Sequence, residues 1–123
     1  MKDGEIVKKV WASCEAMLKE KNYISPVEIL MRVGVLSDKD YREWRYDKVP
    51  YLEMVCKANL RKMSLIMKEF RNFARLNKLK PSHTVYAPWG SKSRKKVLRF
   101  SKSGNPNIEK HYSTHYVKRN IEE

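Results

Sequence analysis

Two histidines, His111 and His115, lie four residues apart in the segment HYSTH. On a helix this spacing points both rings in one direction, which suits a pair of metal ligands or the acid-base groups of a hydrolase. A metal site needs a third ligand, and the glutamate of the zinc-protease signature is missing here. We therefore predict no metal, no cofactor and no catalytic residue. The alternative is a small nuclease or hydrolase that uses His111 and His115 with Arg99 and Lys102.

The segment RFSKSG and the residues after it combine groups that bind phosphate. They are two hydroxyls, two cations, a flexible glycine and the start of a helix at Asn105 and Pro106. The glycine spacing and the lysine-hydroxyl pair of a P-loop are absent. An anion contact and a polar turn that only caps the helix remain the two interpretations. The candidate residues are Arg99, Ser101, Lys102 and Ser103.

Positive charge is concentrated in the second half of the chain. Between Val55 and Ile108 there are fourteen lysine or arginine residues and a single acid, Glu69. Residues 1–60 carry a net charge of +1, and residues 61–123 carry +12 of the total of +13. Like charge at this density repels itself in the folded state, and a polyanionic partner would offset that repulsion.

About half of these cations lie on a segment, residues 51–79, whose pattern predicts one long helix. Its apolar stripe contains Leu52, Val55, Asn59, Met63, Ile66, Phe70 and Phe73. At about 100° per residue, six cations fall opposite this stripe and follow about 30 Å of helix. These cations are Lys57, Arg61, Lys68, Arg71, Arg75 and Lys78. Like charges one turn apart repel by roughly 0.2 to 0.5 kcal/mol per pair, which favours an anion-binding face over an ordinary solvated one.

Residues 26–46 predict a helix, a glycine turn at Gly34 and a second helix, and this order resembles a helix-turn-helix. Ser25 and Glu28 form a capping box for the first helix, predicted over 26–33, and Ser37 caps the second, predicted over 38–46. Arg42 and Arg45 are the candidates for contacts with base edges. Since acids balance the cations here, a purely structural helical hairpin is the alternative.

Residues 84–89 and 97–100 are rich in aromatic and β-branched side chains and predict two short strands. A strand pair after helices, with a basic tip, resembles the wing of winged-helix proteins; an ordinary solvated loop is the alternative. The tip carries Lys92, Arg94, Lys95 and Lys96. Aromatic residues among these cations either stack on bases or belong to the core. They are Tyr86, Trp89, Phe100, Tyr112 and Tyr116.

The predicted fold class is therefore mainly α with a small antiparallel β-hairpin. It is a helix-turn-helix-like bundle with a first helix over 4–21, one long helix, a wing-like hairpin and a last short helix from Pro106 that includes Tyr116. One domain is expected over residues 1–117, with a frayed tail over 118–123. No apolar run is long enough for a membrane span, and the two cysteines are expected to be reduced thiols, so a cytoplasmic protein is expected.

Three phrases, PVEILMRVGVLSDKDYREW, VPYLE and LRFSKSGNPNIEKHYSTHYV, together resemble a family of small basic bacterial proteins without an assigned activity. The resemblance covers residues 25–117. It implies a bacterial or phage setting in the cytosol and carries no functional residue.

These patterns favour a non-catalytic nucleic-acid-binding protein, with duplex DNA as the first choice and RNA as the second. In that case the long helix and the hairpin tip hold phosphates, and affinity is better supported than sequence specificity. A small nuclease, and an inhibitor that occupies the nucleic-acid channel of another protein, are further alternatives. No membrane partner is expected, and a homo-oligomer is compatible with the sequence.

Overall fold

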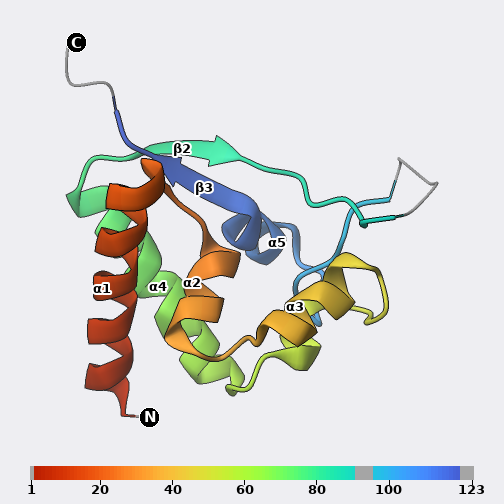
Figure 1. Cartoon of the computed structure of the whole chain (residues 1–123). Helices are drawn as coiled ribbons and strands as arrows, with labels where there is room; N and C mark the ends of the chain where they lie inside the picture. Colours follow the sequence, from red (N-terminus) through yellow and green to blue (C-terminus); the bar gives the residue numbers. More distant parts are fainter. Residues whose placement is uncertain (1, 91–95, 120–123) are drawn as a thin grey trace.

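A computed structural model describes residues 2–90 and 96–119 of the chain. These residues form a mainly helical structure with a small antiparallel sheet, which confirms the predicted α+β class at this coarse level (Figure 1). The elements in chain order are α1 (Asp3–Lys21), β1 (Tyr23–Ile24), α2 (Pro26–Val33), α3 (Asp38–Arg45), the 3-10 turn η1 (Leu52–Val55), α4 (Leu60–Leu76), β2 (Lys80–His83), α5 (Pro106–Ser113) and β3 (Thr114–Val117).

The helices of the first half begin and end at the local signals that predict them. The Ser25 hydroxyl accepts the Glu28 N–H at 3.4 Å, and the Ser37 hydroxyl accepts the Asp40 N–H at 3.1 Å. Gly34 ends α2 with a φ of 98°, in the left-handed region that glycine enters without steric cost. Prediction and structure therefore agree on α2 and differ by one residue at the ends of α1 and α3.

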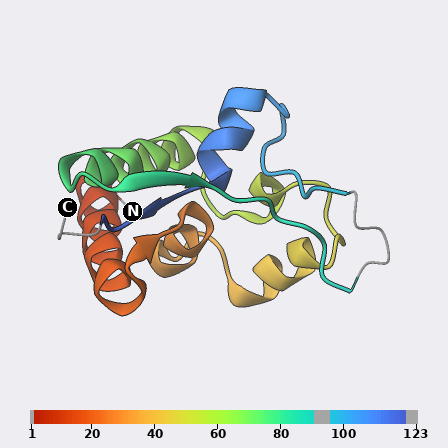
Figure 2. The ribbon, with the colours of Figure 1, turned by 90° about the horizontal axis from the view of Figure 1, so that it is seen from above.

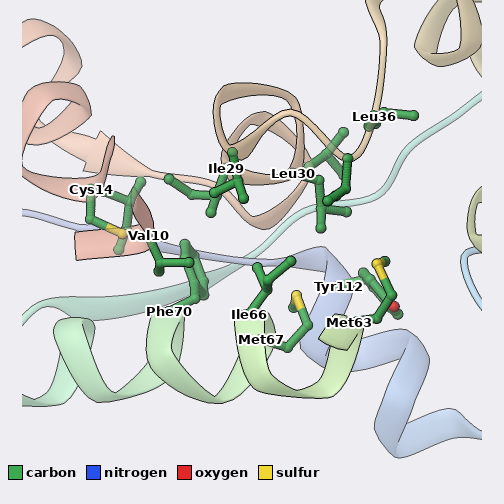
Figure 3. Packing of buried hydrophobic residues seen from close by; sticks show 14 of the residues in the cluster. Val10, Cys14, Ile29, Leu30, Leu36, Met63, Ile66, Met67, Phe70 and Tyr112 are labelled. Atoms are coloured by element: carbon green, nitrogen blue, oxygen red, sulfur yellow. The ribbon is translucent and has the colours of Figure 1, made fainter. Parts of the chain in front are cut away.

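The core is built by packing α1 and α2 onto α4. Val10 and Cys14 of α1 and the α2 residues Ile29 and Leu30 face α4 (Figure 3). Burial of each large aliphatic or aromatic side chain contributes about 1.5 to 3 kcal/mol. At the edge of this core, Trp11 donates its indole N–H to the Glu69 carboxylate at 2.9 Å. Glu69, the only acid between Val55 and Ile108, is thus bound to α1.

The sheet joins parts of the chain that are far apart in sequence. Strand β3 lies between β1 and β2 and is antiparallel to both. Tyr116 is opposite Ile24 on one side and Pro81 on the other, and the centres of the Tyr116 and Phe70 rings are 5.6 Å apart in a T-shaped contact. The sheet therefore lies over α4 and beside the end of α1, as the two views show (Figures 1 and 2).

The prediction of one helix over residues 51–79 is wrong. Residues 52–55 form the 3-10 turn η1, and α4 begins only after Asn59, whose side chain accepts the Lys62 N–H at 2.9 Å. Three backbone donors before Asn59, those of Leu52, Glu53 and Lys57, bind other segments instead of a preceding helical turn. Leu52 N–H binds the Arg99 carbonyl and Lys57 N–H binds the Val35 carbonyl. Lys57 therefore lies outside the helix, and Asn59 is a cap instead of a core residue.

The predicted strand pair over residues 84–89 and 97–100 is also not formed in the described residues. One backbone hydrogen bond joins the two segments, from Leu98 N–H to the Tyr86 carbonyl at 2.8 Å. Other backbone donors of these segments bind residues outside the predicted pair. Thr84 N–H binds the Ser113 carbonyl, and Trp89 N–H binds the Arg45 carbonyl. The tip residues Lys92, Arg94 and Lys95 lie outside the described residues.

The end of the chain differs from the prediction as well. Helix α5 stops at Ser113, so Tyr116 belongs to β3 and not to a helix. After β3, Lys118 N–H binds the Asn22 carbonyl and the Arg119 guanidinium binds the Lys78 carbonyl, both at 2.8 Å. Residues 120–123 of the predicted tail lie outside the described residues.

Helix α3 is anchored by aromatic packing. Trp44 is fully buried against the rings of Tyr86 and Phe100 and donates its indole N–H to the Arg99 carbonyl at 2.8 Å. Phe100 in turn stacks on Tyr112. Tyr86, Phe100 and Tyr112 are thus core residues, which confirms the core interpretation for these three aromatics. Within the described ranges no helix has the length and apolar composition needed to cross a membrane.

Candidate nucleic-acid interface

The outward face of α4 carries cations that pair with no acid in the part of the chain that the structure describes. Met63, Ile66, Phe70 and Phe73 point into the core, so the opposite side of the helix faces solvent. On that side Lys68 and Arg75 are exposed and Arg71 is half-buried. None of these three side chains makes a hydrogen bond or an ion pair with any described residue. This is the part of the predicted basic stripe that remains available to a polyanion.

Three other predicted contact residues are already paired with carboxylates. Arg61 holds Asp3 with two hydrogen bonds of 2.8 and 3.1 Å, and this contact lowers the pKa of the Asp3 carboxyl group. Arg42 pairs with Asp38 one turn earlier in α3 at 2.8 Å. Lys96 reaches Asp47 at 2.6 Å. These pairs are exposed, so each contributes little to stability, but each reduces the positive charge offered to a ligand.

Arg45 has a structural position that differs from its predicted role in base contacts. Its guanidinium carbon lies 4.5 Å from the centre of the Trp89 ring and 5.0 Å from that of Tyr86. The same group donates to the Ala87 carbonyl at 3.2 Å. Arg45 therefore ties α3 to residues 86–89 and is half-buried against them.

The RFSKSG bend is held from inside by two carboxylates. Glu109 accepts the N–H groups of Phe100 and Ser101 at 2.9 and 2.7 Å and the Ser101 hydroxyl at 2.5 Å. Glu53 accepts Lys102 N–H at 3.0 Å. The Arg99 guanidinium donates to the carbonyls of Ser101 and Lys102. Most donors of the expected phosphate cradle are thus used within the protein, while the side chains of Lys102 and Ser103 remain exposed.

The sheet places two cations beside the predicted Lys78 that sequence reasoning missed. Lys80 begins β2, and the Arg119 side chain donates to the Lys78 carbonyl at 2.8 Å. Arg119 belongs to the segment that was expected to be a frayed tail. The segment Thr114–Val117 contains β-branched and aromatic residues that favour a strand, and this signal could have predicted β3 but not its partners.

A cavity of about 600 Å³ opens beside the basic face of α4. It lies between the first turns of α4, the RFSKSG bend and α5. Two cations, Arg71 and Lys102, and one histidine, His111, line it together with one acid, Glu53. Its remaining lining residues are Leu60, Met63, Ser64, Met67, Ser101, Ser103, Ile108 and Tyr112.

The two histidines do not act as a pair on one helix. His111 belongs to α5 and lines the cavity with Arg71, whereas His115 belongs to β3 and lines a separate pocket. Burial lowers the pKa of both, and the charges of Arg71 and Lys110 lower that of His111 further. The hydrolase alternative thus retains His111 and Lys102 in one place, without His115.

Other reactive side chains are held in unreactive forms. Cys14 and Cys56 are free thiols, and burial raises the pKa of each to about 12, so neither is a thiolate near neutral pH. Burial and the hydrogen bond to Glu53 raise the pKa of Tyr112. Across residues 2–90 and 96–119, no three His, Cys, Asp or Glu side chains gather in a way that could hold a metal ion.

The described part of the predicted interface therefore reduces to a face of α4 with two extensions. The core of this α4 cation face is Lys68, Arg71 and Arg75; Lys78 extends it at one end and Lys102 at its flank. Comparisons with protein-family models, with curated proteins and with solved structures found no match to this chain.

Proposed function

We propose that the protein binds nucleic acid without catalysis and holds phosphates with the α4 cation face. The observation that carries this proposal is a group of unpaired cations on one face of α4. Arg32 meets Glu20 and Glu28, whereas Lys68, Arg71 and Arg75 lie within two helical turns and meet no carboxylate among the described residues. Three unpaired cations within two turns repel each other, and a phosphate backbone relieves that repulsion.

The length of the face sets the size of the contact. From Lys68 to Lys78 the chain advances about 15 Å at 1.5 Å per residue, half the length of the predicted stripe. Such a face matches a few phosphates of one strand. With Lys102 included, about five cations neutralise about five phosphates, so the logarithm of the duplex binding constant falls with a slope of roughly −4 to −5 against the logarithm of salt concentration.

Helices α2 and α3 enter this proposal as a scaffold with helix-turn-helix order, not as a base-reading unit. Arg42 pairs with Asp38 and Arg45 packs between two aromatic rings, so neither extends freely from α3. Most contacts would then be made to phosphates, which position a protein but carry no sequence information. Duplex DNA is the preferred partner, and RNA is the alternative.

The test is a salt-titrated binding assay with matched variants. In one variant Lys68, Arg71 and Arg75 are all changed to glutamine. In the control variant Lys8, Lys9 and Lys39, which are exposed cations of the nearly neutral half, are changed in the same way. Both variants lose three positive charges. We expect the α4 variant to lose at least tenfold in affinity and to flatten the slope by about 3, and the control to change little.

Two outcomes contradict the proposal. If the control variant loses as much affinity as the α4 variant, binding depends on overall charge and not on this face. If wild-type protein shows no binding at low salt, or a slope near zero, the nucleic-acid function is wrong. Competition among duplex DNA, duplex RNA and single strands of equal length decides between the DNA and RNA alternatives.

A further inference from the structure

The cavity beside α4 has an apolar floor. Met63 and Met67 of α4 and Tyr112 of α5 lie close together at this side of the core (Figure 3), and all three line the cavity. At its mouth Leu60 is 61% exposed and Ile108 is 40% exposed. Apolar surface in contact with water is unfavourable, so a ligand that covers these side chains gains free energy. A phosphodiester backbone has no apolar part that could do this.

The rim of the same cavity favours negative charge. Arg71 and Lys102 both line it, and their charged groups make no hydrogen bond or ion pair with any described residue. The one acid in the lining, Glu53, uses both oxygens. One accepts Lys102 N–H at 3.0 Å and the other accepts the Tyr112 hydroxyl at 2.7 Å. Glu53 accepts these two hydrogen bonds and forms no ion pair with either cation.

We infer that this cavity binds a small amphiphilic anion, with its apolar body on Met63 and Met67 and its charged head against Arg71 and Lys102. The volume of about 600 Å³ lies within the range of small-molecule sites, which are mostly apolar with a few polar groups that fix orientation. The head is a carboxylate, sulfonate or phosphate monoester, because each accepts hydrogen bonds from a guanidinium. The inference does not depend on nucleic-acid binding.

The experiment uses the fluorescence of anilinonaphthalene sulfonate, which has both an aromatic body and an anionic head. Binding to the wild-type chain should raise and blue-shift its emission. Decanoate, which has both parts of the proposed ligand, should displace it. Decanol, which lacks the charge, should compete at least about tenfold less well, since a charge-assisted hydrogen bond contributes about that factor. Inorganic phosphate, which lacks the apolar body, should not compete.

Matched variants locate the bound probe. Arg71→Ala removes a rim cation and should weaken binding about tenfold. Arg75→Ala removes a cation one turn further along α4, outside the cavity lining, and should change binding less than about twofold. Ser64→Trp places a large ring at the exposed wall of the cavity and should abolish probe binding while salt-dependent DNA binding persists. Circular dichroism melting verifies that each variant is folded.

Several results would overturn the inference. Probe binding retained in Ser64→Trp would place the probe elsewhere. Equal losses in Arg71→Ala and Arg75→Ala would show attraction to overall charge. Equal competition by decanol and decanoate would show an apolar surface without an anion site. If a mononucleotide competes better than decanoate, the ligand class is wrong and the cavity serves nucleotides.

Discussion

At the scale of single residues, several charged side chains that the sequence marks as candidates for ligand contacts are bound within the protein instead. Arg45 packs on two aromatic rings, Arg99 closes its own bend, and Glu109 holds the backbone of Phe100 and Ser101. What remains for ligands is a smaller set of cations on α4. A residue type therefore indicates what a side chain can do, whereas its partners decide what it is free to do.

His115 should make the fold sensitive to mild acid. The Tyr86 hydroxyl and His115 Nε2 are 3.0 Å apart. A neutral imidazole can accept a hydrogen bond from this hydroxyl, whereas a protonated imidazole cannot. Burial lowers the pKa of His115 in the folded state, and Glu28 offsets this by a smaller amount. The unfolded state then binds protons more readily, so the stabilising contribution is complete above the unfolded pKa of about 6.5 and is lost as pH falls through the folded pKa.

The measurement is the free energy of unfolding by urea between pH 7.5 and about 5. We expect it to decrease toward acid in the wild type and to decrease less in His115→Gln. Lys39→Ala, an exposed substitution without a group that titrates in this window, is the control. A wild-type profile that is flat, or one that His115→Gln leaves unchanged, would refute this assignment.

At the scale of elements, local signals explain the helices and long-range pairing explains the corrections. Capping residues and the three- and four-residue spacing of apolar side chains act within a few positions, so α1, α2 and α3 are visible in the sequence. The predicted start of α4 lies too early, because the prediction placed the Asn59 cap on the apolar stripe and because Lys57 N–H binds Val35, more than twenty residues away. The sheet pairs Tyr23 with Val117, and a pattern within a short window contains no trace of that partner.

Asn59 should determine where α4 begins. Its side chain accepts Lys62 N–H at 2.9 Å, and loss of such a cap costs about 1 kcal/mol. Asn59→Ala should lower the free energy of unfolding by about that amount. Asn59→Asp should keep the free energy of unfolding near that of the wild type. A carboxylate also accepts the hydrogen bond and interacts well with a helix N-terminus. Urea titrations of the three proteins measure the difference. Equal stability of Asn59→Ala and wild type would mean that this cap is not needed.

At the scale of the whole molecule, charge and fold are coupled. The prediction of a basic half was right in composition, but pairing across the fold could not be foreseen: Arg61 meets Asp3 and Lys96 meets Asp47. These partners are brought together only by packing of α1 on α4 and of residues 96–100 near α3. The positive charge of the candidate site and its main helix were thus predictable from the sequence. Which of the cations stay unpaired was not.

Unpaired charge on α4 should make the protein more stable in salt. Repulsion among Lys68, Arg71 and Arg75 is screened as the Debye length shortens from about 30 Å at 0.01 M to about 10 Å at 0.1 M salt. The melting temperature should therefore rise by a few degrees over this range. The triple glutamine variant of these residues should respond less than the variant of Lys8, Lys9 and Lys39. An equal response in both variants would assign the effect to overall charge.

The central position of β3 has a consequence for how the chain folds. Because β1 and β2 do not pair with each other, neither has a sheet partner until residues 114–117 have been synthesised. Helices α1, α2 and α4 precede that point and can pack beforehand. Closing the sheet then joins Tyr23 to Val117 across about three quarters of the sequence, and such distant contacts slow folding. During synthesis, the sheet can therefore form only after helices α1, α2 and α4 are complete.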